Sequence, residues 1–190
     1  MMKEIMGTEI YDGMRLGHIW HELMRLHEII RKEKPVWFVE VGIHEGGLTY
    51  NLLQEFNFNY VGIEINCNII KPKVRALVNS KDNASITCGD CFSNHTLAYI
   101  RALAGKKIVY CDGGNKAEEL IAYAGTVVKG DLLMAHDYSD YQRNVIGFPD
   151  YATSVSPEVV PSDVVFLRSG YSEVYEKLLQ NTRIFAVRKL

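Results

Sequence analysis

Acidic side chains follow the apolar runs of this 190-residue sequence at regular intervals. Glu40 and Glu64 lie near the ends of the runs VWFVEV and YVGIEI, and Asp90, Asp112 and Asp137 follow three later runs. The carboxyl ends of parallel strands meet at one edge of a sheet, which is where open α/β sheets bind ligands. Carboxylates gathered there can accept hydrogen bonds from a ligand, remove a proton or hold a cation.

A glycine-rich turn follows the first of these runs, in the pattern Glu40-x-Gly42-x-x-x-Gly46. Glycine permits a tight turn and lets a ligand lie against bare backbone. Glu64 stands 22 residues after Gly42, a separation typical of a glycine turn and an acidic residue that accepts hydrogen bonds from ribose hydroxyls. Each feature alone has a structural explanation, such as a common strand–helix turn or a solvated strand end. Together they favour a nucleoside-containing ligand.

The third apolar run ends in CGDCF, which adds two candidate contacts for an adenine ring. Asp90 is placed to accept a hydrogen bond from the adenine amine, and Phe92 to cover the ring face; the alternative for Asp90 is a cap on the following helix. A dinucleotide fingerprint would have glycine in the place of Glu40, since an anion there repels a diphosphate. The same anion suits a cofactor that carries a cationic amino-acid end.

The motif Glu40-x-Gly42-x-x-x-Gly46 resembles the first motif of class I S-adenosylmethionine-dependent methyltransferases, Glu/Asp-x-Gly-x-x-x-Gly. The resemblance implies S-adenosylmethionine as the cofactor, with Glu40 and the glycines beside its methionine moiety. It further implies that Glu64 holds the ribose and that Asp90 faces the adenine. Glu40 would then serve through its charge, in contact with the cofactor or with an ordered water.

Asp112 in YCDGGNK and the pair His136-Asp137 in MAHDY end the fourth and fifth runs. Catechol-type O-methyltransferases place metal-binding carboxylates at these positions, and the motifs also look like the cephalosporin-hydroxylase-like and macrocin-type small-molecule methyltransferases. The resemblance implies that Asp112, His136 and Asp137 are catalytic and are candidate ligands of Mg²⁺, which would acidify a bound hydroxyl. The catechol type has Asp-Asn after strand five, so His136 is alternatively a metal-free general base. Lys116 is either a solvated lysine or the partner of a carboxylate in this cleft.

The resemblance predicts a methyltransferase that acts on a small-molecule acceptor, most simply on a hydroxyl group. His18 and His21, on the first predicted helix, are surface residues or line the acceptor pocket. Two other functions stay open: a non-catalytic nucleoside-binding module, and a nicotinamide-dependent oxidoreductase, although no Tyr-x-x-x-Lys pair was found. The net charge of −2 and the absence of Asn/Asp-Pro-Pro-Tyr after the fourth strand argue against nucleic acid as a partner.

Strand-like and helical stretches alternate about five times, which predicts an α/β fold. We expect a Rossmann-like, doubly wound, mainly parallel sheet of about seven strands with helices on both faces. The predicted strands are 36–41, 60–65, 84–88, 107–112, 131–137 and 183–189. The predicted helices are 15–33, about 48–56, a helix starting near Pro72, 94–104, a helix capped by Asn115, and 171–180. A single domain is expected, with an N-terminal helical cap (1–35), a cofactor-binding core (36–137) that carries the resemblance, a candidate lid loop (138–163) and a C-terminal helix and closing strand (164–190).

The composition, with 47% apolar and 23% charged residues, is typical of a soluble globular protein. No apolar run is long enough to span a membrane, and no secretion signal is recognisable at the N-terminus. We therefore expect a cytoplasmic chain whose four cysteines are reduced and bind no metal. Because few residues are available to cover the cleft, a homo-oligomer in which a second subunit completes the pocket is a hypothesis.

Overall fold

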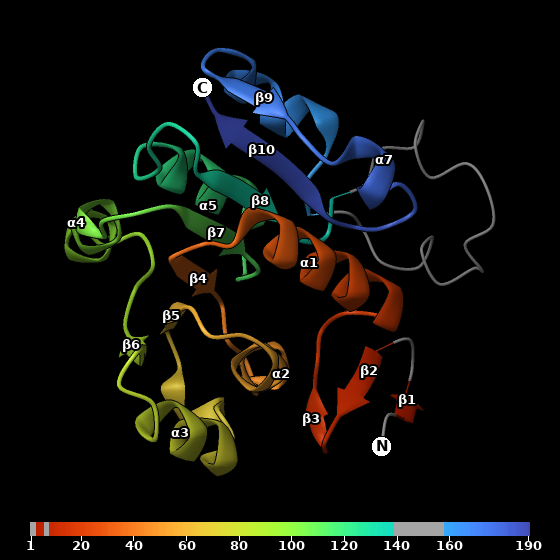
Figure 1. Cartoon of the computed structure of the whole chain (residues 1–190), viewed down its shortest axis with the longest axis vertical. Coiled ribbons are helices and arrows are strands. Elements are labelled where there is room, and N and C mark those ends of the chain that lie inside the picture. The colour runs from red at the N-terminus through yellow and green to blue at the C-terminus, as the bar shows by residue number, and fades with distance from the viewer. Residues whose placement is uncertain (1–2, 6–7, 139–157) are drawn as a thin grey trace.

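A seven-stranded sheet forms the centre of the computed structural model, which describes residues 3–5, 8–138 and 158–190 (Figure 1). From one edge to the other, its strands are β6 (Ala84–Cys88), β5 (Asn59–Glu64), β4 (Trp37–Val41), β7 (Lys107–Cys111), β8 (Leu132–Ala135), β10 (Phe185–Lys189) and β9 (Tyr171–Glu173). The five strands from β6 to β8 are parallel, and β10 runs antiparallel to both of its neighbours. The predicted mainly parallel, Rossmann-like sheet is confirmed.

The order of the strands reverses beside β4. The chain moves outward from β4 to β5 and β6, and then returns to the other side of β4 with β7 and β8. Ligands of open α/β sheets bind in the crevice beyond the carboxyl ends of the strands at such a point. Val41 and Cys111 are register partners at the ends of β4 and β7. The glycine turn and Asp112 therefore leave the sheet side by side.

Alternate residues of the central strands are buried on opposite faces of the sheet. Phe38 and Tyr110 pack in a cluster with residues of α1 (Trp20–Glu33) and α2 (Gly47–Glu55). Val39 and Val109 pack in a second cluster with residues of α4 (Asn94–Ala102) and α5 (Lys116–Ala124). Both faces are covered, which explains why the strands read as continuous apolar runs. The remaining helical elements are η1 (Cys67–Ile69), α3 (Pro72–Asn79), η2 (Pro161–Arg168) and α7 (Glu176–Leu179).

The N-terminal region differs from the expected helical cap. Residues before the first helix form a small antiparallel sheet of β1 (Lys3–Ile5), β2 (Thr8–Tyr11) and β3 (Met14–Arg15), and α1 begins only at Trp20. Asp12 and Gly13 connect β2 to β3 and both have positive φ, 49° and 77°. An Asp-Gly pair between two strands is a strong hairpin signal, because both central residues of the turn need positive φ. The helix predicted to start at residue 15 instead starts at Trp20, because the Asp-Gly turn pairs Arg15 with β2.

The C-terminal region is confirmed in part. The closing strand is present as β10, but the helix predicted for 171–180 is replaced by strand β9 and the short helix α7. The segment 164–167, for which the sequence did not decide between strand and helix, lies within the 3₁₀ helix η2. Most of the candidate lid loop, residues 139–157, lies outside the described residues.

A disulfide joins Cys67 to Cys88, which corrects the expectation of reduced cysteines. Cys88 ends β6 as the register partner of Glu64, and Cys67 lies three residues beyond Glu64. The neighbouring strands therefore bring the two sulfurs together, a proximity that spacing along the sequence did not reveal. Cys91 and Cys111 are free thiols. None of the helices in the described part of the chain is long and apolar enough to cross a membrane.

Candidate active site

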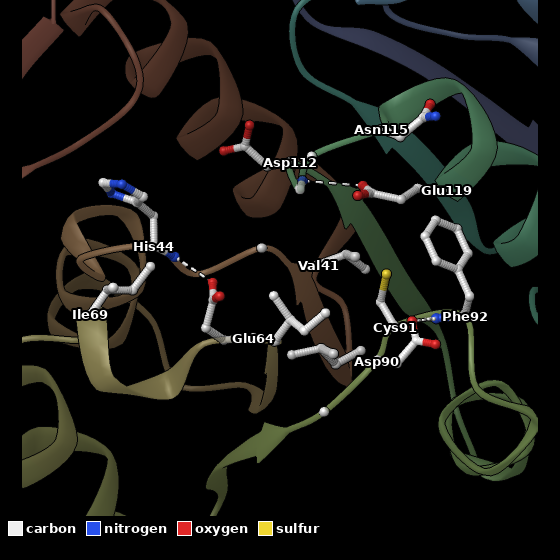
Figure 2. A pocket seen from close by; sticks show the side chains of 16 residues that line it. Val41, His44, Glu64, Ile69, Asp90, Cys91, Phe92, Asp112, Asn115 and Glu119 are labelled. Carbon is white, nitrogen blue, oxygen red and sulfur yellow. Dashed lines mark hydrogen bonds between the residues drawn. The ribbon is translucent and has the colours of Figure 1, made fainter.

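A cavity of about 510 Å³ lies at the carboxyl ends of β4, β5, β6 and β7 (Figure 2). Its lining comes from the turns that follow these strands, as expected at the point where the strand order reverses. Five of the residues singled out in the sequence line it: Gly42, Glu64, Asp90, Phe92 and Asp112. Residues that are up to 70 positions apart along the chain thus share one cavity.

The turn after β4 approaches the turn after β7 very closely. Gly42 has a φ of 88°, and a Cβ built on it would stand 2.5 Å from the Cα of Gly113. No side chain fits in that space, so glycine at position 42 is needed for both the backbone conformation and the contact. The contact brings the glycine turn directly against the residues that follow Asp112.

Glu64, the residue predicted to hold a ribose, connects the cavity to the glycine turn. Its Oε2 accepts hydrogen bonds from the backbone amides of Ile43 (3.1 Å) and His44 (2.9 Å), and its Oε1 accepts one from Asn66 (2.9 Å). Figure 2 shows the contact with His44 and the carboxylate at the edge of the cavity. Glu64 therefore fixes the turn while part of it stays accessible from the cavity.

The adenine side predicted from CGDCF lies at the opposite wall. Asp90 accepts a hydrogen bond from the amide of Phe92 at 2.9 Å, and Phe92 is 38% exposed. Phe92, Cys91 and Glu119 all line the cavity, and Figure 2 shows them on one side of it. An exposed aromatic ring beside a carboxylate suits a flat heterocycle that carries an amine.

Two predicted cofactor residues, Glu40 and Gly46, are not among the residues that line the cavity. Glu40 is 1% exposed, and its Oε2 accepts hydrogen bonds from the hydroxyls of Tyr60 (2.7 Å) and Thr49 (3.0 Å). Burial raises the pKa of Glu40 to about 8, so its carboxyl is mostly protonated at neutral pH. Glu40 is therefore a buried, uncharged acid beneath the turn, and not the anion that was expected to face the cofactor. Gly46 instead precedes α2, where a Cβ would meet Val74.

Glu119 lines the same cavity and was not singled out in the sequence. Its Oε2 accepts a hydrogen bond from the amide of Gly113 at 3.1 Å, and the side chain is 1% exposed. Burial raises the pKa of Glu119 to about 7. Its position four residues after the cap residue Asn115 was the available signal, because that spacing turns it back toward the strand end.

The side chains of Asp112 and His136 meet directly, at the end of the site where catalysis is predicted. Nδ1 of His136 lies 3.2 Å from Oδ1 of Asp112, and Nε2 lies 3.1 Å from the carboxylate of Glu22. Burial disfavours charge on the ring, but the Asp112 and Glu22 carboxylates hold the pKa of His136 well above its usual value. His136 is 2% exposed, whereas Asp112 lines the cavity. Asp112 is therefore the member of this pair that a ligand can reach.

Asp137 is held by two cations. Arg183 donates to its Oδ1 at 2.8 Å, and the ammonium of Lys116 lies 3.1 Å from its Oδ2. Burial opposes ionisation, but His136, Lys116 and Arg183 together hold the pKa of Asp137 well below its usual value. Lys116 is itself buried, so the alternative in which it pairs with a carboxylate in the cleft is confirmed.

Helix α1 brings further polar groups to this end of the sheet. His18 precedes the helix and is fully buried, with its ring 4.1 Å from that of His136 between centroids. Glu22 is also fully buried and accepts hydrogen bonds from Arg183. His21, in contrast, is exposed. Of the two histidines considered in the sequence, His18 joins the site and His21 does not.

No protein-family model and no curated protein matches the sequence. Solved structures do match in fold. CmcI aligns with a TM-score of 0.66 and 16% identity, over 95% of this chain and 75% of that chain. A caffeoyl-CoA O-methyltransferase structure from Staphylococcus aureus has a TM-score of 0.61 and 11% identity (88% and 82%), and a methyltransferase from Geobacter sulfurreducens has 0.55 and 15% (90% and 80%).

The chain has a methyltransferase fold. This confirms the resemblance at the level of the fold, because identities of 16% or less leave the chemistry to be argued from the site. CmcI has been solved with Mg and SAM and with SAH. The sequence did not predict that Glu22, Glu119 and Arg183 belong to the site. Of the three, Glu22 had the clearest signal in the sequence, because it is an acid next to the apolar positions of α1.

Proposed function

We propose that the protein transfers a methyl group from S-adenosylmethionine to a hydroxyl group of a small molecule. One observation carries the proposal: Gly42, Glu64, Asp90 and Phe92 share a cavity with Asp112. The cavity, at about 510 Å³, falls in the range of small-molecule and cofactor sites. The methyltransferase fold and the SAM-bound CmcI structure support the same assignment.

The nucleoside part of the cofactor is assigned to the wall between Glu64 and Phe92. A carboxylate offers about four lone-pair sites, and backbone amides occupy three of those of Glu64. The remaining site accepts a hydrogen bond from a ribose hydroxyl. Phe92 covers a face of the adenine, and Asp90 or Glu119 accepts a hydrogen bond from its amine. The methionine moiety lies against the bare backbone of Gly42.

The acceptor is assigned to the end of the cavity that Asp112 lines. Methyl transfer breaks the bond between the methyl carbon and sulfur, forms a carbon–oxygen bond and turns the sulfonium into a thioether. The acceptor hydroxyl loses its proton in the same process, and Asp112 is the reachable group that can accept this proton. His136 positions Asp112 through the 3.2 Å contact with its Oδ1. Because His136 is buried and carries a proton, it serves this positioning role better than that of a free general base.

The side chains fit Mg²⁺ poorly. Mg²⁺ prefers oxygen ligands in octahedral geometry, whereas His136 supplies nitrogen. Both oxygens of Asp137 are already engaged, one by Arg183 and one by Lys116. If Mg²⁺ were held between Asp112 and Asp137, it would bind the acceptor oxygen and lower its pKa. The cations already present at Asp137 disfavour that arrangement.

A calorimetric titration of the full chain with S-adenosylhomocysteine tests the proposal, with NADH as the comparison ligand. We expect binding of S-adenosylhomocysteine in the micromolar range, about −8 kcal/mol, and none of NADH. Glu64→Gln removes one charge from the ribose contact and is expected to weaken binding at least about tenfold. Glu45→Gln, in the same turn but outside the cavity lining, is the matched control and should bind as wild type does.

The remaining outcomes are decisive against the proposal. Binding of NADH without binding of S-adenosylhomocysteine would support the oxidoreductase alternative. Equal loss of affinity in Glu64→Gln and Glu45→Gln would mean that the substitutions disturb the glycine turn and that the loss does not report a ribose contact. Incubation with methyl-labelled S-adenosylmethionine and a panel of catechols, phenols and sugars would then test transfer itself. A chain that binds the cofactor and labels none of these would favour the non-catalytic module.

A further inference from the structure

Two histidines and a carboxylate converge at the end of the cavity. His18, Asp112 and His136 each offer one ligand atom, and the three atoms lie within 4.8 Å of one another. His18 comes from the segment before α1, Asp112 follows β7, and His136 follows β8. The two histidines are buried and Asp112 lines the cavity. The cluster therefore has a closed side made of protein and an open side that faces the ligand cavity.

Each histidine is oriented through its other ring nitrogen. Nδ1 of His18 lies 3.0 Å from the carbonyl oxygen of Leu16. A carbonyl oxygen can only accept, so Nδ1 carries the proton and Nε2 keeps its lone pair. Nε2 of His18 lies 2.6 Å from the hydroxyl of Tyr110 and 3.7 Å from Oδ2 of Asp112. The unprotonated nitrogen of His18, which accepts a hydrogen bond from the Tyr110 hydroxyl, thus faces the cluster.

His136 shows the same arrangement with a carboxylate in place of the carbonyl. Its Nε2 lies 3.1 Å from Oε2 of Glu22, and Arg183 fixes this carboxylate through one backbone and two side-chain hydrogen bonds. Its Nδ1 points to Asp112. Metal-binding histidines almost always donate their second N–H to a carbonyl or a carboxylate, which fixes the ring and raises its basicity. Both histidines of the cluster have that support.

The spacing of the ligand atoms is close to that of a loaded site. Metal–nitrogen and metal–oxygen bonds of about 2.1 Å place neighbouring ligand atoms roughly 3.0–3.4 Å apart. Oδ1 of Asp112 lies 3.2 Å from Nδ1 of His136, and Oδ2 of the same carboxylate lies 3.7 Å from Nε2 of His18. A small movement of His18 away from the Tyr110 hydroxyl would complete the geometry.

We propose that His18, Asp112 and His136 bind a divalent transition metal, with open coordination positions toward the cavity. Two imidazoles and one carboxylate favour zinc, cobalt, iron or manganese over Mg²⁺, which prefers oxygen. Asp137 is not a ligand of this metal, because Arg183 and Lys116 occupy its carboxylate. The ligand set expected from the sequence contained Asp137 as its third member, whereas the proposed set contains His18. The metal site stands on its own geometry. Metal binding would displace the proton that Nδ1 of His136 otherwise holds toward Asp112, and a role for the metal in acceptor binding rests on the proposed function.

Cobalt(II) is a suitable probe, because its visible absorption reports nitrogen and oxygen ligands in a protein site. We expect the full chain to bind Co²⁺ stoichiometrically with a visible band, and an excess of Mg²⁺ not to displace it. His18→Gln should abolish the band. His21→Gln, three residues further along and exposed, is the matched control and should keep it. Asp137→Asn should also keep the band.

Folding is checked in the same samples by circular dichroism, since His18 is buried. Tyr110→Phe removes only the hydroxyl that competes for Nε2 of His18, and is expected to bind Co²⁺ at least as tightly as wild type. A band that survives in folded His18→Gln, or that is lost in Asp137→Asn alone, would overturn the proposed ligand set. Displacement of Co²⁺ by equimolar Mg²⁺ would overturn the metal preference. Titration of the same samples with S-adenosylhomocysteine separates the two proposals, since cofactor binding without Co²⁺ binding contradicts only the metal site.

Discussion

Gly42 and Gly113 touch across the crevice between β4 and β7. A Cβ on Gly42 would stand 2.5 Å from the Cα of Gly113 and 2.6 Å from the carbonyl oxygen of Asp112. The glycine turn forms one wall of the cavity and Asp112 belongs to another. The distance between the cofactor side and the proposed acceptor side is therefore set by a contact between two backbones.

Gly42→Ala is expected to lower the free energy of unfolding by about 2–3 kcal/mol, because the new methyl group clashes with backbone and the φ of 88° is strained for alanine. Thermal or urea unfolding measures this. Gly114→Ala is the control, since a Cβ there meets nothing within 4 Å. Equal stability of the two variants would contradict the close contact.

Glu40 predicts a pH dependence of stability. Burial raises its folded pKa to about 8 from an ordinary 4.5, so the folded state binds the proton more tightly than the unfolded chain. Its contribution to stability is present below pH 4.5 and is lost as the pH rises to about 8. Relative to pH values below 4.5, the stability lost at pH 7 through this linkage is roughly 3 kcal/mol.

Glu40→Gln keeps the acceptor for the hydroxyls of Tyr60 and Thr49 and removes the ionisation. We expect it to flatten the decline in stability between about pH 5 and pH 8, measured by urea unfolding at several pH values. Glu55→Gln, at an exposed position, is the control and should leave the decline in place. A decline equally steep in Glu40→Gln would mean that other groups cause it.

The disulfide between Cys67 and Cys88 links the segment that carries Ile69 to the end of β6, next to Gly89. Ile69 and Gly89 both line the cavity. Cys67→Ser is expected to lower the free energy of unfolding by about 3 kcal/mol, the chain-entropy value for a loop of this length. It should also weaken binding of S-adenosylhomocysteine, because the two walls are no longer linked. Cys91→Ser, which leaves the disulfide intact, is the control. Reduction of the wild type should reproduce the effect of Cys67→Ser and leave that variant unchanged.

Glu119 predicts a pH dependence of cofactor binding. Its pKa of about 7, raised by burial, places its ionisation in the neutral range. In the proposed arrangement Glu119 can accept a hydrogen bond from the adenine amine, and an ionised carboxylate accepts more strongly than a neutral acid, so the affinity should rise as Glu119 ionises, between about pH 6 and pH 8. Calorimetry with S-adenosylhomocysteine should find this rise absent in Glu119→Gln. Glu118→Gln, on the exposed neighbouring position, should retain it; a rise that persists in Glu119→Gln would assign it to another group.

Much of the architecture could be predicted because it depends on local patterns. The runs that became β4, β5, β7 and β8 are buried on both faces, which is typical of a sheet covered on two sides. Pro72 begins α3, and Asn115 caps α5 by accepting from the amide of Glu118 at 3.2 Å. Parallel strands end at the same edge of the sheet, so the residues that follow them could be placed at one cavity. These residues are Gly42, Glu64, Asp90, Phe92 and Asp112.

The sequence by itself thus determined the fold class and the edge of the sheet where the site lies. The tertiary structure decided which groups are free to act there, since that depends on partners distant along the chain. Arg183 and Lys116 bind the carboxylate of Asp137. The hydroxyls of Tyr60 and Thr49 donate hydrogen bonds to the buried Glu40. Cys67 and Cys88 form a disulfide only because β5 and β6 are neighbours. Charge, protonation and coordination are set by three-dimensional contacts, and periodicity along a sequence carries no record of them.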